Sequence, residues 1–183
     1  MAQAVTLKGK TAAVGFVALS FARIGLGFVF LWAFFDKLLG LGFATCKNAL
    51  TGTTDFGCAQ AWGQGGSPTE GFLSHATQGP FASWFQELAG QTWVDWLFML
   101  GLLGIGVSLL LGVMVRIGAV AGSVMLLLMW AAILWPANNP VLDDHIIYIF
   151  ALVTIAAFAR YQKLSFGKWW QKLPVVRKMP WLV

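Results

Sequence analysis

Four long apolar runs, separated by polar stretches, dominate the pattern of the chain. They cover approximately residues 12–35, 96–115, 117–135 and 141–159. A transmembrane helix needs about 20 consecutive, mainly apolar residues, and the runs reach or nearly reach that length. The fourth run is the weakest, because its uninterrupted apolar part begins only after His145. We therefore expect an all-α integral membrane protein in which four spanning helices pack as a bundle.

The polar connections between the runs differ greatly in length. Only a few residues around Arg116 separate the second run from the third, which indicates a tight hairpin. Residues 36–95 separate the first run from the second, and a loop of this length is usually functional or carries structure of its own. Residues 67–70 have the form of a capping box, with Ser67 as the N-cap of a short helix and Glu70 reaching back to it.

A second short helix is predicted in the same loop, starting after Gly79 and Pro80. Its apolar residues are spaced as on one face of a helix, and they are Phe81, Trp84, Phe85 and Leu88. We expect this amphipathic helix to lie on the outer membrane surface or to cap the bundle. The loop is therefore predicted to be structured.

Composition agrees with a membrane protein. Of the 183 residues, 58% are hydrophobic and 10% are charged, whereas a soluble domain is roughly half apolar and a quarter charged. The runs leave no room for a soluble catalytic domain, so we interpret residues 1–183 as one membrane domain.

The charges predict an orientation. Lys8 and Lys10 precede the first run, Arg116 lies in the hairpin, and residues 160–183 form a basic tail without an acid. All seven acids lie on the other side, accompanied only by Lys37 and Lys47. Cytoplasmic segments collect Lys and Arg, so both termini are expected in the cytoplasm and loop 36–95 outside. The net charge of +5 then reflects the orientation of the chain in the membrane, and we expect no nucleic-acid partner.

Cys46 and Cys58 both lie in the long outer loop, in the oxidising compartment. A structural disulfide is the favoured interpretation, and it would contribute about 2–3 kcal/mol. A redox-active pair and two free thiols remain as alternatives. No Cys-x-x-Cys, nucleotide fingerprint, metal-spaced cluster or matched pair of haem ligands is visible. We therefore expect no covalently bound cofactor, and any electrons would pass through a bound ligand or a partner.

Arg23 lies near the middle of the first apolar run, and no acid is close to it in the sequence. A charge inside the membrane is a functional candidate by default. Three explanations remain open: Arg23 reaches lipid phosphates, bonds carbonyls at a helix end, or contacts a ligand or partner subunit.

Titratable residues collect at the outer ends of the runs. Asp144, His145 and Tyr148 start the fourth, and Asp36, Lys37 and Asp95 end the first and start the second. If the four helices pack as a bundle, these groups would lie close together at its outer end. We expect His145, held by Asp144, to exchange protons there. Asn139 is expected to cap the fourth helix, leaving Asp143 as a plain acid near the helix start.

Several stretches resemble the DoxX/DoxD family of four-span bacterial membrane proteins. The resemblance rests on ARIGLGFVFLWAFFDKLLGLGFAT, GGSPTEGFLSHATQGPF, VDWLFMLGLLGIG, LLGVMVR and NNPVLDDHIIY. It covers nearly the whole chain and is closest to the large, DoxD-type subunit of thiosulfate:quinone oxidoreductase.

This resemblance implies a bacterial plasma-membrane subunit, of the thiosulfate dehydrogenase (quinone) type, that passes electrons from thiosulfate to a membrane quinone. An apolar bundle with proton-handling groups at its mouth also suits a lipid-soluble ring. The expected partners are the bilayer, a quinone and other membrane subunits, including a small DoxA-type subunit. The alternative is a non-catalytic accessory subunit of a respiratory or redox membrane complex.

Overall fold

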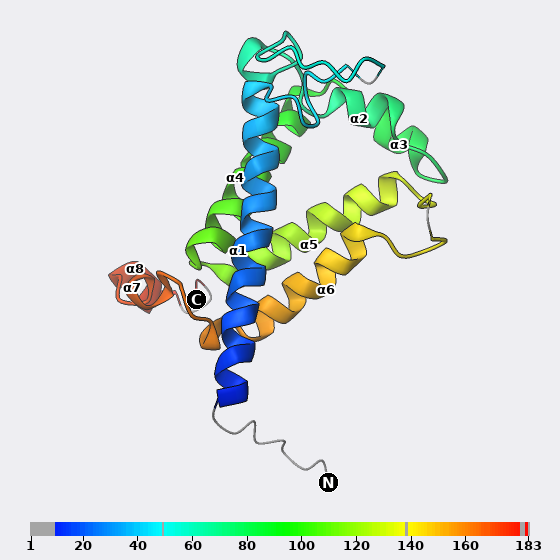
Figure 1. Ribbon diagram of the computed structural model, residues 1–183. Helices are drawn as coiled ribbons and strands as arrows, with labels where there is room; N and C mark the ends of the chain where they lie inside the picture. The colour runs from blue at the N-terminus through cyan, green and yellow to red at the C-terminus, as the bar shows by residue number, and fades with distance from the viewer. Residues whose placement is uncertain (1–9, 49, 138, 180–181, 183) are drawn as a thin grey trace.

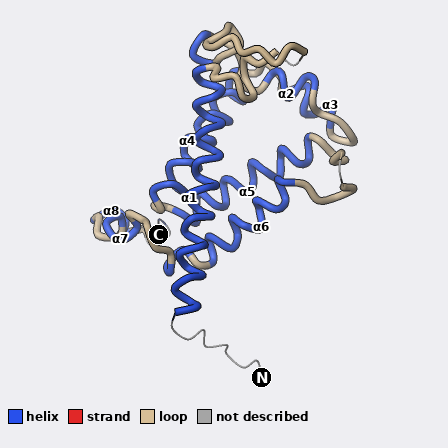
Figure 2. Tube along the Cα trace, in the orientation of Figure 1, coloured by secondary structure: helices blue, strands red, loops and turns tan. Residues whose placement is uncertain are grey.

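The computed structural model describes residues 10–48, 50–137, 139–179 and 182. Within them all regular elements are helical, apart from an isolated bridge between Lys47 and Thr54 (Figure 2). The long helices are α1 (Lys10–Leu39), α4 (Thr92–Leu111), α5 (Val115–Ala132) and α6 (Asp144–Ala157). The short ones are η1 (Trp62–Gln64), α2 (Glu70–His75), α3 (Ala82–Glu87), η2 (Ala159–Tyr161), α7 (Gly167–Trp170) and α8 (Pro174–Lys178).

Three of the long helices are long and apolar enough to cross a membrane: α1 over Thr11–Leu39, α4 and α5. Helix α6 has 14 residues, about 21 Å of rise, and is shorter than the expected fourth run. The second run also ends earlier than expected. Gly112 adopts the left-handed conformation with φ 69° and ends α4 at Leu111, a frequent way for helices to stop.

The residue that caps α6 is not Asn139, as the sequence predicts. The Asp143 carboxylate accepts hydrogen bonds from the backbone N–H groups of His145 and Ile146, at 3.1 and 3.3 Å. Asn139 instead closes a preceding turn by accepting from the N–H groups of Val141 and Leu142. Asp143 is therefore the N-cap, and the residues before it are not helical.

The four long helices pack as two pairs (Figure 1). Helix α1 lies along α4, and α5 along α6, while α4–α5 and α1–α6 contacts join the pairs. Glycines allow the first pair to approach closely: a Cβ at Gly27 would lie 2.6 Å from the backbone nitrogen of Leu110. The buried core contains residues from all four helices, including Phe30, Met99, Leu109, Leu126, Leu152 and Ile155.

The outer faces of these helices are strongly apolar. Phe21 is 61% exposed, Leu97 65%, Val120 63% and Phe150 59%. Such a density of exposed large apolar side chains would be unfavourable in water but suits contact with lipid.

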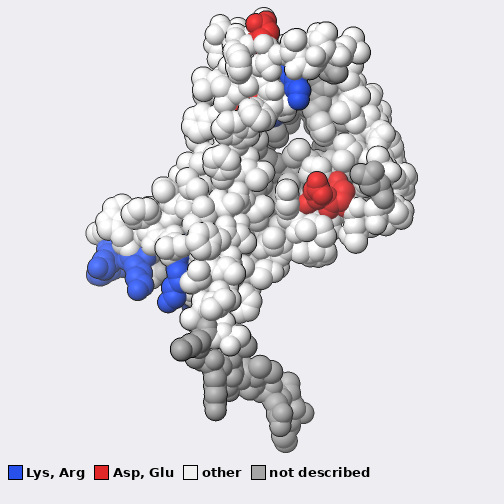
Figure 3. Space-filling model, viewed as in Figure 1, with Lys and Arg blue, Asp and Glu red and all other residues white. Residues whose placement is uncertain are grey.

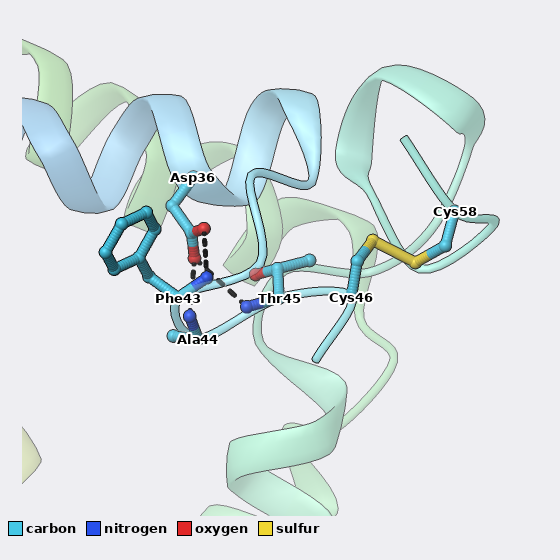
Figure 4. Close-up of a disulfide and its surroundings, with 6 residues drawn as sticks. All are labelled: Asp36, Phe43, Ala44, Thr45, Cys46 and Cys58. Atoms are coloured by element: carbon cyan, nitrogen blue, oxygen red, sulfur yellow. Dashed lines mark hydrogen bonds between the residues drawn. A yellow bond between two sulfur atoms is a disulfide. The ribbon is translucent and has the colours of Figure 1, made fainter. Parts of the chain in front are cut away.

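The segment between α1 and α4 folds over the end of the α1–α4 pair at which α1 ends and α4 begins (Figure 1). Cys46 and Cys58 are joined by a disulfide with an S–S distance of 2.04 Å, so the structure contains the bridge that the sequence favoured. Nearby, the buried Asp36 carboxylate accepts from the backbone N–H groups of Phe43, Ala44 and Thr45, at 2.9–3.0 Å (Figure 4). These bonds attach the loop to the end of α1.

The capping box is only partly as expected. The Ser67 hydroxyl accepts from the Glu70 N–H at 3.1 Å, but α2 begins at Glu70 and has Thr69 as its N-cap. The Ser67 hydroxyl donates to Asp95 instead of forming part of a reciprocal box. The helix therefore starts two residues later than the sequence predicts.

Candidate functional site

An apolar cavity of about 550 Å³ lies between α4 and α5, beneath α2 and α3. Helix α4 contributes Trp93, Leu97, Phe98 and Gly101, and α5 contributes Ala121, Val124, Met125 and Leu128. The covering helices contribute Phe72, Leu73, Trp84 and Phe85. Ligand sites are typically apolar hollows of this size with a few polar groups, so this cavity is the candidate functional site.

Hydrogen bonds hold the covering helices above the cavity. On the α4 side, the Asp95 carboxylate accepts from the Ser67 and Thr69 hydroxyl groups at 2.8 and 2.6 Å. On the α5 side, Gln78 donates through its backbone N–H to the Ala132 carbonyl, and its side chain reaches the carbonyl oxygens of Ile133 and Trp135. The cover is thus attached to both helices that form the walls.

The cavity opens onto the apolar surface of the helices. Several of its lining residues are also largely exposed: Trp93 by 59%, Leu97 by 65%, Val124 by 53% and Leu128 by 48%. These residues belong to the faces that suit lipid contact. An apolar molecule dissolved in the membrane could therefore enter between α4 and α5.

Lys37 is the one charged residue among the described residues that line this cavity. It belongs to the last turn of α1 and is partly buried. Its Nζ lies 5.9 Å from the centroid of the Phe98 ring, a distance suited to a cation–π interaction. The carboxylate of the adjacent Asp36 accepts its hydrogen bonds from the loop. The Lys37 ammonium can therefore donate a hydrogen bond to a ligand at this apolar surface.

The sequence predicts that the titratable residues lie together at one end of the helices, but hydrogen bonds do not connect the remaining ones into one site. Among the described residues, Asp36 and Asp95 bond to parts of the loop between α1 and α4, and His145 bonds to Asp143. Asp144 is exposed, Tyr148 packs against the core, and neither they nor His145 line the cavity. These groups lie apart because α1 and α4 form one pair of helices and α5 and α6 form the other.

The expected partner of His145 is also wrong. The imidazole Nδ1 lies 2.7 Å from the Asp143 carboxylate, not against that of Asp144. The reason is the cap, because an N-cap side chain folds over the first turn, where the imidazole lies.

Arg23 is fully buried and binds backbone carbonyls. Its Nη1 donates to the carbonyl oxygens of Leu109 and Leu110, and its Nη2 to that of Leu164 at 2.9 Å. Of the three explanations left open by the sequence, helix-end carbonyls are the one observed. A ligand or partner contact at Arg23 stays a prediction, and its buried Nε has no hydrogen-bond partner among the described residues.

Most cavity residues were not singled out by the sequence. Two signals were available: Lys37 was among the titratable residues expected at the helix ends, and the spacing of Phe81, Trp84, Phe85 and Leu88 predicted a helix of which three residues line the cavity. The α4 and α5 lining could not be recognised, because its residues look like any other apolar helix residues.

Comparisons with known proteins add no assignment. The chain matched no model of a protein family, no functionally characterised protein and no solved structure.

Proposed function

We propose that the protein binds a lipid-soluble quinone in the cavity beneath α2 and α3. The observation that carries this proposal is the cavity itself: an apolar volume of about 550 Å³, open toward the lipid-facing surface, with the Lys37 ammonium at its wall. A quinone has a flat apolar ring and two carbonyl oxygens. Aromatic side chains suit the ring, and an ammonium suits a carbonyl oxygen.

Lys37 has two tasks in this proposal. It donates a hydrogen bond to one quinone carbonyl, which orients the ring. It also stabilises the negative charge that develops on that oxygen when electrons arrive. Complete reduction takes up two electrons, which the thiosulfate-oxidising partner subunits supply, and two protons. Lys37 can deliver one proton at the oxygen that it contacts, and water supplies the other and reprotonates Lys37.

In the same proposal the chain is a membrane subunit of a quinone-linked oxidoreductase. The resemblance to the DoxX/DoxD family supports a thiosulfate:quinone oxidoreductase, with other membrane subunits as partners. The four long helices then form a bundle in a bacterial plasma membrane, with loop 36–95 outside and both termini in the cytoplasm. The charge distribution of the sequence supports this orientation.

The accessory-subunit alternative drew support from an Arg23 without an acid in the chain, because a partner could supply the anion. Both Nη groups of Arg23 bond to carbonyls of the chain, whereas its buried Nε has no hydrogen-bond partner among the described residues. The catalytic role expected of His145 stays a prediction, and the proposal gives it no contact with the ring.

Two matched pairs of variants test the proposal. Val124→Trp fills the cavity, whereas Val120→Trp changes an exposed valine one turn away on α5 that does not line it. The affinity for decylubiquinone is measured by calorimetry in lipid nanodiscs. We expect Val124→Trp to weaken binding at least tenfold and Val120→Trp to leave it unchanged.

Lys37→Met tests the polar contact, with the exposed Lys47→Met as control. A hydrogen bond to a charged group contributes about 1.5–3 kcal/mol, so we expect Lys37→Met to weaken binding by at least about tenfold. Binding that survives both Val124→Trp and Lys37→Met would exclude this cavity. Specific binding without electron transfer from thiosulfate, in the presence of partner subunits, would favour the accessory role.

A further inference from the structure

A second, smaller cavity lies where α4 ends, α5 begins and the chain leaves α6. Its volume is about 70 Å³. Three basic side chains from different elements line it: Arg116 from α5, Arg160 from η2 and Lys168 from α7. Figure 3 shows the surrounding basic patch, in which Lys and Arg gather over α7, α8 and the end of α6.

No acid of the chain balances these charges. The acids are at positions 36, 55, 70, 87, 95, 143 and 144, and none lines the cavity. In the described part of the chain the ion pair present joins His145 to Asp143. The remaining polar lining residues, Gln162, Ser165 and Gln171, are neutral. Like charges around one hollow repel each other, and a bound anion removes that cost.

The start of α5 contributes further donors. This helix has 18 residues, follows Met114 and has no side-chain cap. Its first residues, Val115 and Arg116, line the cavity. The first N–H groups of a helix lack partners within it, and the helix dipole favours an anion at that end. Three basic side chains and the first residues of α5 thus line one small hollow.

We propose that this cavity binds a phosphate group. A volume of about 70 Å³ is small and suits a compact anion. The cavity lies beside the ends of α4 and α5, two helices able to cross a membrane. The headgroup of an anionic phospholipid is therefore the first source of the phosphate, and inorganic phosphate is the second.

The test removes two exposed charges from the cavity and two from the neighbouring tail. The cavity variant is Arg160→Gln with Lys168→Gln, and the control is Lys172→Gln with Lys178→Gln, which are also exposed but do not line the cavity. Nanodiscs contain phosphatidylcholine and phosphatidylglycerol, and native mass spectrometry counts the phosphatidylglycerol retained per protein. A cation near a membrane surface contributes about fivefold to anionic-lipid binding wherever it lies, whereas a hydrogen bond from a charged side chain to a bound phosphate contributes about tenfold or more. We expect the cavity variant to lose binding by at least about 100-fold, and the control by no more than about 25-fold.

A second arm distinguishes the two sources. Inorganic phosphate is added to phosphatidylcholine nanodiscs, and thermal unfolding is followed, because a bound ligand raises the Tm. A rise for wild type and control but not for the cavity variant assigns the site to free phosphate. No rise, together with selective loss of phosphatidylglycerol, assigns it to lipid.

Equal behaviour of the cavity variant and the control in both arms would overturn the proposal, and these basic residues would be topology anchors only. Unfolding in phosphatidylcholine alone checks that both variants fold. If their Tm values differ there, the single variants Lys168→Gln and Lys172→Gln repeat the comparison.

Discussion

Arg23, in the first half of α1, donates a hydrogen bond to the carbonyl oxygen of Leu109, in the last turn of α4. The last four carbonyl groups of a helix have no partner within it. They also form the negative end of the helix dipole, which favours a cation. A guanidinium buried in an apolar protein can therefore be stabilised without a carboxylate, and Arg23 holds α1, α4 and the segment after α6 together.

The first prediction follows from these contacts. Arg23→Leu leaves buried carbonyl oxygens without donors, at about 1–3 kcal/mol each. We expect the free energy of unfolding to fall by roughly 3 kcal/mol or more. Arg23→Lys should lie between wild type and Leu, because a compact ammonium cannot reach both segments at once. Unfolding in detergent measures both, and an Arg23→Leu protein as stable as wild type would contradict the role given to these bonds.

Asp36 allows a similar test of the loop between α1 and α4. Its carboxylate accepts three backbone N–H bonds and is 1% exposed. Asp36→Asn replaces one accepting oxygen by an NH₂ group that faces donors, so we expect a loss of about 1–3 kcal/mol and faster proteolysis of residues 40–48. Asp55→Asn, exposed in the same loop, is the control and should leave both measurements unchanged.

The disulfide predicts a redox dependence of stability. Joining Cys46 to Cys58 should stabilise the fold by about 2–3 kcal/mol. A reductant should therefore lower the Tm of wild type, whereas the double variant Cys46→Ser, Cys58→Ser should start lower and not respond. Alkylation without reductant, read by mass spectrometry, should find no reactive thiol at either position; modification of both would exclude the bridge.

Local patterns predicted the helices well and their ends poorly. Apolar runs long enough to cross a membrane are visible residue by residue, so α1, α4 and α5 could be expected. The ends depend on single backbone conformations, such as that of Gly112, and on which of several acids acts as cap. The cavity depends on contacts between segments distant in sequence, such as Asp95 with Thr69, and no periodicity reports such a contact.

The orientation of the chain can be measured with single cysteines. We expect Lys172→Cys to react with an impermeant maleimide only after cells are opened, because the basic tail faces the cytoplasm in the proposed topology. Thr51→Cys, exposed in the outer loop, should react in intact cells. The native cysteines are bonded to each other and should give no background. Reaction of Lys172→Cys in intact cells would reverse the proposed topology.

Variants at the start of α6 distinguish a structural role of the Asp143–His145 pair from a catalytic one. Asp143 caps the helix and holds His145. Asp143→Ala should therefore lower the free energy of unfolding by about 1 kcal/mol, and Asp144→Ala, which alters an exposed acid outside both contacts, should lower it less. Thermal unfolding of the two variants under one set of conditions makes this comparison.

Quinone-linked turnover tests whether His145 also exchanges protons. If it does, His145→Gln should lower turnover by at least about 100-fold. Because Asp143 and not Asp144 holds the imidazole at 2.7 Å, we expect Asp143→Asn to share this loss and Asp144→Asn to escape it. Quinone affinity should not change in any of the three, since none of these residues lines the cavity. Unchanged turnover in His145→Gln, in a preparation where Lys37→Met abolishes it, would restrict the Asp143–His145 pair to starting the helix.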